Sequence, residues 1–295
     1  MINADDRLPR TEVRLVGRRM SLVDVGSGPP LLFLHGNATY SYTWRNVIPF
    51  LATNHRCLAP DLMGMGRSDL TLPSGPGSYS FADHLENLHL LPEMTGVTEP
   101  MVIVGHEFGA ALAVQLARRR PDLVRGVVLI EGVLRISNDT VLDDDLRQFL
   151  SRVRSHEGEQ MVLTENQIVD RYLPRLTARR LSSEEMAHYR APYPKPGEPR
   201  RAMLSMIRQL PLQSMPGPID SSIEESRLWA VQSRLPKLVV GGNPGYLVPH
   251  SILGTAARWA ETTVASVRGI HFLTEDSPAR ITALILDWLP AIGHR

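Results

Sequence analysis

The stretch MVIVGHEFGAALAVQLARRRP, residues 101–121, decides the fold. Its first five residues are apolar on both faces, which predicts a covered β-strand, and the run after residue 109 predicts a helix. The turn between them has Gly105 and Gly109 on either side of Glu107. Glycines suit a sharp strand-to-helix turn because neighbouring backbones there leave no space for side chains. The pattern predicts that Glu107 is held exposed at the top of a sheet, with the first N–H groups of the helix aimed at it.

Other strand-like runs lie on both sides of this unit. They cover residues 12–16, 20–26, 30–36 and 56–62 before it, and residues 126–132, 236–242 and 262–269 after it. Helical patterns separate most of these runs. The alternation predicts an α/β protein with a mostly parallel, doubly wound sheet.

Residues 133–212 differ from the rest of the chain. They are rich in Arg, Glu and Met, contain the proline-rich segment APYPKPGEP, and lack a strand-like run. This composition predicts a helical cap inserted between two parts of the core, residues 1–132 and 213–295.

Composition limits the possible partners. The 295 residues include 32 Lys and Arg against 31 Asp and Glu, so we expect neither a nucleic-acid nor a membrane partner. The N-terminal segment lacks the apolar region of a secretion signal, which predicts a cytoplasmic protein. No spacing of His, Cys and carboxylates resembles a metal site, and we expect no cofactor. The expected partner is a small-molecule substrate, and the expected state is a monomer or a homodimer.

Two further residues complete a candidate site with Glu107. In this fold class the nucleophile, the acid and the histidine follow one another along the chain. Glu131 ends an apolar strand and His271 follows the last one, whereas the strand over residues 236–242 is followed only by Asn243. We therefore assign the orienting acid to Glu131. The alternatives are an ordinary turn glutamate at 107 and a helix-capping or surface glutamate at 131.

Several segments resemble the haloalkane dehalogenases of the α/β-hydrolase superfamily. The segments are HGNATYSYTWRNVIPFL, PDLMGMGRSD, LPSGPGSYSFADH, VGHEFGAAL, LIEG, LSSEEMAHYRAPY, PKLVVGGNPG and IHFLTEDSPARI. The resemblance is to the subfamily whose acid follows the sixth strand, which also includes a coelenterazine luciferase. It extends from about residue 12 to residue 291.

The resemblance implies a role for each site residue. Position 107 is the nucleophile, His271 activates water for ester hydrolysis, and Glu131 orients His271. Asn37 and position 108 bind the halide, and His35 and Gly36 shape the oxyanion region. A pocket is expected from Leu134, Phe149, Ile168, Leu173, Leu204, Tyr246 and Leu247, although ordinary cap packing also explains most of these residues.

Two positions depart from the family pattern, which has aspartate at 107 and tryptophan at 108. Glu107 is one methylene longer, and a displacement of about 1 Å can cost about 10²-fold in rate. Phe108 lacks an N–H donor, and the loss of one preorganised donor costs roughly 3 kcal/mol. We therefore expect dehalogenation to be weak or lost.

Three interpretations of the function remain, and the first is that the site has changed its reaction. Glu107 acts as nucleophile or general base on another metabolite, in a cyclisation, elimination or hydrolysis. Alternatively, the protein is a working dehalogenase with glutamate as nucleophile, or an inactive ligand-binding protein. Epoxide hydrolases also use a carboxylate nucleophile together with cap tyrosines, and Tyr172 and Tyr189 lie in the predicted cap, where packing is the alternative role.

Overall fold

The computed structural model describes residues 2–134, 144–210 and 217–294, and its centre is one eight-stranded sheet. The strands are β1 (Arg10–Leu15), β2 (Arg18–Val25), β3 (Pro30–Leu34), β4 (Arg56–Pro60), β5 (Met101–His106), β6 (Val124–Ile130), β7 (Lys237–Pro244) and β8 (Thr262–Gly269). Their order is β1-β2-β4-β3-β5-β6-β7-β8. Strand β2 pairs antiparallel with β1 and β4, and the other pairs are parallel. The predicted mostly parallel α/β sheet is confirmed.

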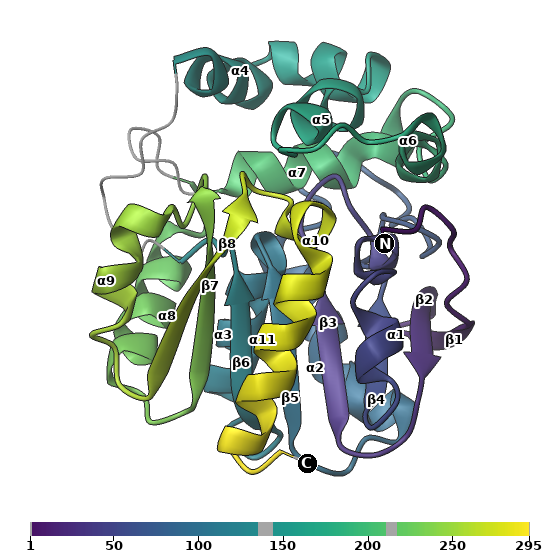
Figure 1. The fold of residues 1–295 in the computed structure, drawn as a ribbon. Coiled ribbons are helices and arrows are strands. Elements are labelled where there is room, and N and C mark those ends of the chain that lie inside the picture. Colours follow the sequence, from purple (N-terminus) through teal and green to yellow (C-terminus); the bar gives the residue numbers. More distant parts are fainter. Residues whose placement is uncertain (1, 135–143, 211–216, 295) are drawn as a thin grey trace.

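Helices cover both faces of the sheet because the central strands are apolar on both sides (Figure 1). On β3, Leu31 and Phe33 join one hydrophobic cluster, while Leu32 and Leu34 join the other. The first cluster includes side chains of α1 (Ile48–Leu51) and α11 (Pro278–Ala291). The second includes side chains of α2 (Phe81–Thr95), α3 (Phe108–Arg119) and α8 (Asp220–Gln232). Short helices η1 (Ser41–Trp44), η5 (His250–Ile252), α9 (Leu253–Ala256) and α10 (Leu273–Asp276) complete the core.

A helical layer lies above the carboxyl ends of the parallel strands (Figure 1). It comprises α4 (Asp144–Arg154), the π-helices η2 (Glu159–Thr164) and η3 (Ile168–Tyr172), α5 (Leu173–Arg175), α6 (Ser183–Arg190), η4 (Glu198–Arg200) and α7 (Arg201–Gln209). Residues 144–210 contain no strand. We call this layer the cap. The predicted boundary at 212/213 lies outside the described residues, and the domain limits stay predictions.

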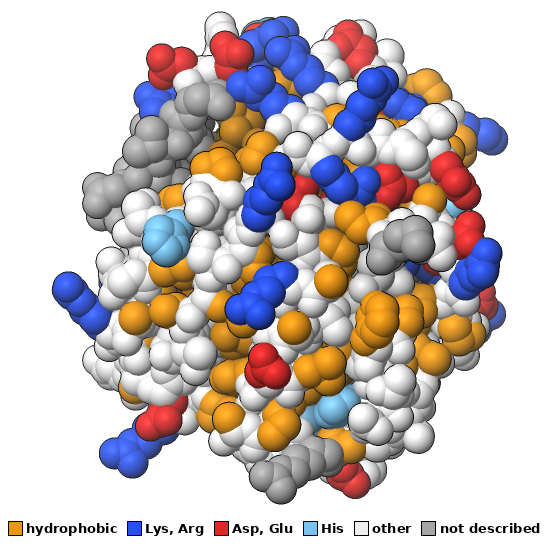
Figure 2. All heavy atoms as spheres, in the orientation of Figure 1, with side chains coloured by type: hydrophobic (Ala, Val, Ile, Leu, Met, Phe, Trp, Pro, Cys, Tyr) orange, Lys and Arg blue, Asp and Glu red, His pale blue; other side chains and the backbone are white. Residues whose placement is uncertain are grey.

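The described surface has no dominant charge. Basic and acidic side chains are interspersed on the face shown in Figure 2, in keeping with the net charge of +1. Among the described helices, none is both long and apolar enough to cross a membrane. Cys57 is buried in β4, and burial raises the pKa of its thiol to about 12, so the thiol stays protonated and unreactive.

Candidate active site

Glu107 occupies the turn between β5 and α3 in a strained backbone conformation. Its φ of 52° is unusual for a residue with a side chain. The turn is tight, since a Cβ on Gly105 would lie 2.5 Å from the Gly109 carbonyl oxygen, and a Cβ on Gly109 would lie 2.1 Å from that of Leu34. Glycine is therefore required at both positions, as the sequence pattern indicates.

Backbone N–H groups hold the Glu107 carboxylate. Its Oε2 accepts a hydrogen bond from the Asn37 N–H at 2.7 Å, and the Phe108 N–H is a second backbone donor. A Cβ on Gly36 would lie 2.4 Å from the same oxygen, so only glycine lets the carboxylate approach this loop. The structure thus brings Gly36, Asn37 and Phe108 together around the Glu107 carboxylate.

The exposure of Glu107 differs from the simple strand-to-helix prediction. The side chain is only 2% exposed, because it lies against the loop after β3. Burial raises the pKa of the Glu107 carboxyl to about 7, although the N–H groups of Asn37 and Phe108 act in the opposite direction. The carboxyl therefore titrates near neutral pH, where it can serve as nucleophile or base.

His35 fixes the loop that carries these donors. Its Nε2 accepts the Leu62 N–H at 2.9 Å, and its Nδ1 lies 2.9 Å from the Gly36 carbonyl oxygen, to which it donates. Burial lowers the pKa of His35, so the ring stays neutral. Both ring nitrogens are occupied, and His35 therefore shapes the oxyanion region without being available for proton transfer.

The side chains expected to bind a halide offer few donors. Asn37 Oδ1 accepts the Ala38 N–H at 2.7 Å, which fixes the orientation of the amide, and Nδ2 donates to the Met203 carbonyl oxygen of α7 at 2.9 Å. One of the two amide hydrogens is thereby used by the cap. Phe108 is fully buried, with its ring edge-to-face against Phe81 at 5.3 Å.

Glu131 lies at the end of β6, next to β5 in the sheet, and has φ 45°. Its carboxylate accepts one N–H group from β7 itself, that of Gly242 at 3.1 Å. It accepts three more from the segment after β7: Tyr246 at 3.2 Å, Leu247 at 2.7 Å and Val248 at 3.2 Å. The end of β7 and the segment after it therefore supply donors to an acid that follows β6, in place of an acid at position 243.

His271 completes the pair with Glu131. Its Nδ1 lies 3.3 Å from Glu131 Oε2, and both side chains are buried. Burial raises the pKa of Glu131 and lowers that of His271, so the imidazole is neutral. A neutral ring that donates from Nδ1 has an unprotonated Nε2, which is the state a general base needs. The backbone of His271 is fixed by its N–H bond to Leu176 and by the His106 ring, which donates to its carbonyl oxygen.

Glu107 and His271 are connected through His106. The ring of His106, adjacent to Glu107 in the chain, lies 5.1 Å from the His271 ring between centroids. Within the described residues, no hydrogen bond joins the Glu107 carboxylate to His271. A base that activates water rather than the carboxylate does not need that bond.

The predicted pocket residues lie in one hydrophobic cluster with Phe108. Leu134, Phe149, Ile168, Leu173, Leu204 and Tyr246 are buried members of the cluster, and Leu247 packs against it partly buried. Their role in lining a substrate cavity stays a prediction. The cap tyrosines have different surroundings, because Tyr172 lies beside His271 whereas the Tyr189 hydroxyl bonds to Glu275.

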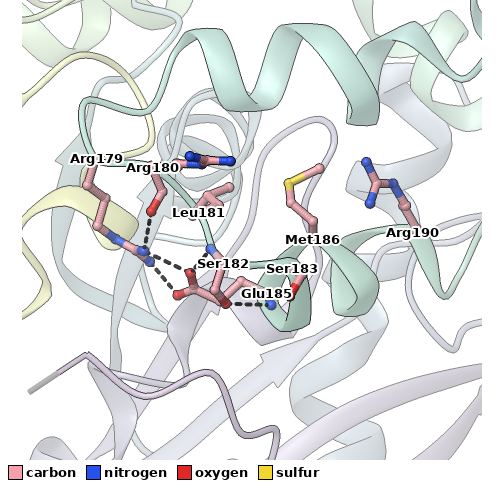
Figure 3. Close-up of a pocket in the computed structure, with 8 residues that line it drawn as sticks. All are labelled: Arg179, Arg180, Leu181, Ser182, Ser183, Glu185, Met186 and Arg190. Atoms are coloured by element: carbon pink, nitrogen blue, oxygen red, sulfur yellow. Dashed lines mark hydrogen bonds and ion pairs between the residues drawn. The ribbon is translucent and has the colours of Figure 1, made fainter.

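Sequence reasoning missed a buried ion cluster between the cap and the core. Arg45 contacts Glu275 at 2.5 Å and Glu185 at 2.8 Å, and Arg179 bonds to the same two carboxylates. Arg179 and Glu185 also line a surface depression of about 570 Å³ on the cap, which none of the predicted site residues lines (Figure 3). The capping box of Ser182 and Glu185 was the only sequence signal, and it indicates a helix start rather than an ion pair.

The comparisons with known proteins decide the family. A family model described as the alpha/beta hydrolase fold matches residues 29–155. A haloalkane dehalogenase of Sphingobium indicum is 38% identical over 273 residues, which is 92% of each chain. One from Mycolicibacterium smegmatis is 36% identical and covers 94% of this chain and 89% of its own.

The chain belongs to the haloalkane dehalogenase family. Solved structures agree: a putative ancestral haloalkane dehalogenase matches with a TM-score of 0.89 and 36% identity, over 97% of this chain and 100% of its own. The haloalkane dehalogenase of Agrobacterium tumefaciens matches with a TM-score of 0.88 and 30% identity, over 98% of both chains. This haloalkane dehalogenase-family protein is therefore an α/β-hydrolase-fold enzyme, as predicted.

Proposed function

We propose that this enzyme hydrolyses a small, mainly apolar substrate through an ester on Glu107. The observation that carries the proposal is the buried Glu107 carboxylate, with Oε2 held by the Asn37 N–H at 2.7 Å. One oxygen is fixed by backbone donors, and the other is available to attack a carbon atom. The C–O bond that forms produces a glutamyl ester, and the group displaced from that carbon accepts the bonding electrons.

His271 and Glu131 are assigned to the second step. The neutral imidazole takes a proton from water, and the resulting hydroxide attacks the ester carbonyl carbon. Negative charge then develops on the carbonyl oxygen of the ester, and the preorganised N–H groups of Asn37 and Phe108 at the Glu107 carboxyl stabilise it. Collapse of the intermediate breaks the bond to the alkoxide oxygen, which takes the proton from the imidazolium of His271 and leaves as the alcohol. The Glu107 carboxyl then loses its remaining proton to solvent.

Dehalogenation is expected to be slow for three reasons. Phe108 has no side-chain N–H for a departing halide, and Asn37 uses one amide hydrogen on the cap. Glu107 takes the place that the family resemblance gives to aspartate, and its longer side chain displaces the attacking oxygen. General-base chemistry is the second candidate, because the pKa of Glu107 is about 7.

The test is to trap the ester. The His271→Gln variant is incubated with short-chain haloalkanes, epoxides and aryl esters. Intact mass detects a covalent adduct, and peptide mapping locates the modified residue. We expect an adduct on Glu107 that disappears in the Glu107→Gln/His271→Gln control. Turnover by the wild-type enzyme without any adduct in the trapping variant would favour the general-base alternative. Full turnover by Glu107→Gln alone would contradict both roles.

A further inference from the structure

Two tyrosine side chains converge on His271 from different parts of the chain. Tyr172 comes from η3 in the cap, and its ring centroid lies 6.4 Å from that of His271 at an interplanar angle of 74°. Tyr246 comes from the segment after β7, and its centroid lies 5.1 Å away at 81°. Both tyrosines are more than nine-tenths buried. The base of the proposed mechanism is therefore flanked by two phenols.

The surroundings of each phenol fix its position. The Tyr246 N–H donates to Glu131, so the segment that holds the acid also places this side chain. The Tyr172 ring stacks on Phe149 at 5.9 Å and meets Phe272 edge-on at 6.3 Å. The Tyr172 hydroxyl is linked to Tyr246 by a side-chain hydrogen bond and interacts electrostatically with the Glu107 carboxylate. The two hydroxyl groups thus meet near the nucleophile.

The Tyr172 phenol remains protonated at neutral pH. Burial raises the pKa of Tyr172 well above its usual value, and the negative charge on Glu107 acts in the same direction. A protonated phenol is a hydrogen-bond donor, and it can pass its proton to a stronger base such as an alkoxide.

The distribution of donors favours oxygen over halide as the displaced group. A departing halide needs hydrogen-bond donors but no proton, and Phe108 and Asn37 supply little of that kind. An alkoxide oxygen needs a proton as it forms, and hydroxyl groups lie beside the Glu107/His271 pair. An epoxide presents both features in one molecule, an electrophilic carbon for a carboxylate and an oxygen that stays attached when the ring opens.

We propose that the substrate class is a small apolar epoxide whose ring oxygen is bound by the hydroxyl groups of Tyr172 and Tyr246. This inference rests on the proposed ester mechanism at Glu107. The carboxylate forms a bond to one ring carbon, the C–O bond of the ring breaks, and its electron pair stays on oxygen. That oxygen takes a proton from a phenol, which leaves a hydroxyalkyl ester. Water activated by His271 then hydrolyses the ester to a diol, and the second proton of the water restores the phenol.

The test compares two classes of substrate, epoxides and a bromoalkane, that alkylate the same carboxylate. Ester formation on the His271→Gln background is timed with 1,2-epoxyhexane, styrene oxide and 1-bromohexane. The Tyr172→Phe and Tyr246→Phe variants keep both rings and remove only the hydroxyl groups. General acid catalysis contributes about 10²- to 10⁴-fold. We therefore expect the double variant to lower the ratio of epoxide to bromide reaction rates by at least about 10²-fold.

The control is Tyr193→Phe, which removes the hydroxyl of another buried cap tyrosine and should leave the ratio unchanged. An equal loss of both reactions in the tyrosine variants would overturn the donor role, since a structural defect would affect both substrates. Alkylation of Glu107 by 1-bromohexane without any epoxide opening would overturn the epoxide assignment but leave the ester mechanism intact. Failure of all three compounds to modify Glu107 would count against both.

Discussion

Glu107 and Glu131 are a natural pair to compare. Both follow adjacent parallel strands, both have a positive φ (52° and 45°), and burial raises the pKa of both. Their hydrogen bonds differ. Glu131 accepts four backbone N–H groups and faces His271, whereas Glu107 has the backbone donors of Asn37 and Phe108.

This difference in hydrogen bonding shows how glutamate can serve two roles in one site. An ionised carboxylate has about four lone-pair positions. Four backbone N–H groups and His271 Nδ1 use up the acceptor capacity of Glu131, so this side chain is suited to hold and orient an imidazole. The donors around Glu107 occupy only part of its capacity, which leaves an oxygen for chemistry. The same substitution at each position should therefore affect a different half of the reaction.

The largest effect is expected for Glu107→Gln. The neutral amide is a poor nucleophile, so ester formation should fall by at least about 10⁴-fold, as for other essential nucleophiles. Rapid quenching and intact-mass detection measure the rate. If the Glu107→Gln variant still formed the adduct, at another residue, Glu107 would not be the nucleophile.

Glu131→Gln should have a smaller and later effect. Loss of the orienting acid slows the water step by about 10²- to 10⁴-fold, because the imidazole is held less well and its cation is no longer stabilised. The glutamyl ester should therefore accumulate, which a time course of intact mass would reveal. If Glu131→Gln instead blocked ester formation as strongly as Glu107→Gln, the division of roles would be wrong.

The pH dependence should report the ionisation of the attacking carboxylate. Only the ionised carboxylate attacks carbon, and the pKa of Glu107 is about 7. Ester formation should thus rise about tenfold per pH unit below 7 and level off above it. The His271→Gln variant is used for this measurement because the ester is expected to accumulate in it. A flat profile between pH 5 and 8 would show that Glu107 is ionised throughout.

The smallest expected effect concerns stability. A carboxyl whose pKa rises on folding, from 4.5 to about 7 for Glu107, makes the folded state less stable as pH increases between these values. Glu107→Gln should remove this loss and raise the free energy of unfolding at pH 8 by up to roughly 3 kcal/mol, with little change near pH 4.5. Denaturant titration at both pH values measures it.

The same measurement on Glu131→Gln sharpens the comparison. The amide nitrogen cannot accept the N–H groups of the segment after β7, so unsatisfied donors would remain in the core, at a cost of about 1–3 kcal/mol. We therefore expect a smaller gain, or a loss, at pH 8. Equal gains for both variants would mean that the surrounding donors matter little.

The fold was predictable because its signals are local. Apolar runs predicted every strand of the sheet, and glycine sterics at 105 and 109 predicted the turn that carries Glu107. The order along the chain and the position of each residue after a strand also indicated Glu131 and His271 as candidates, since the carboxyl ends of parallel strands meet at one edge. These features depend on residues that are neighbours in the sequence.

The finer chemistry of the candidate site depends on contacts between distant residues. Asn37 gives an amide hydrogen to Met203, and Tyr172 and Tyr246 meet at the His271 ring. No periodicity or motif links these positions. The packing of the cap on the core determines these contacts.

The sequence by itself determined a parallel α/β core with a carboxylate at a glycine-flanked turn, because backbone sterics and hydrophobic periodicity act over a few residues. Only the tertiary structure decided which hydrogen-bond donors surround each glutamate. Those donors come from loops and helices far apart in the chain, and their directions are fixed only when the cap packs on the sheet.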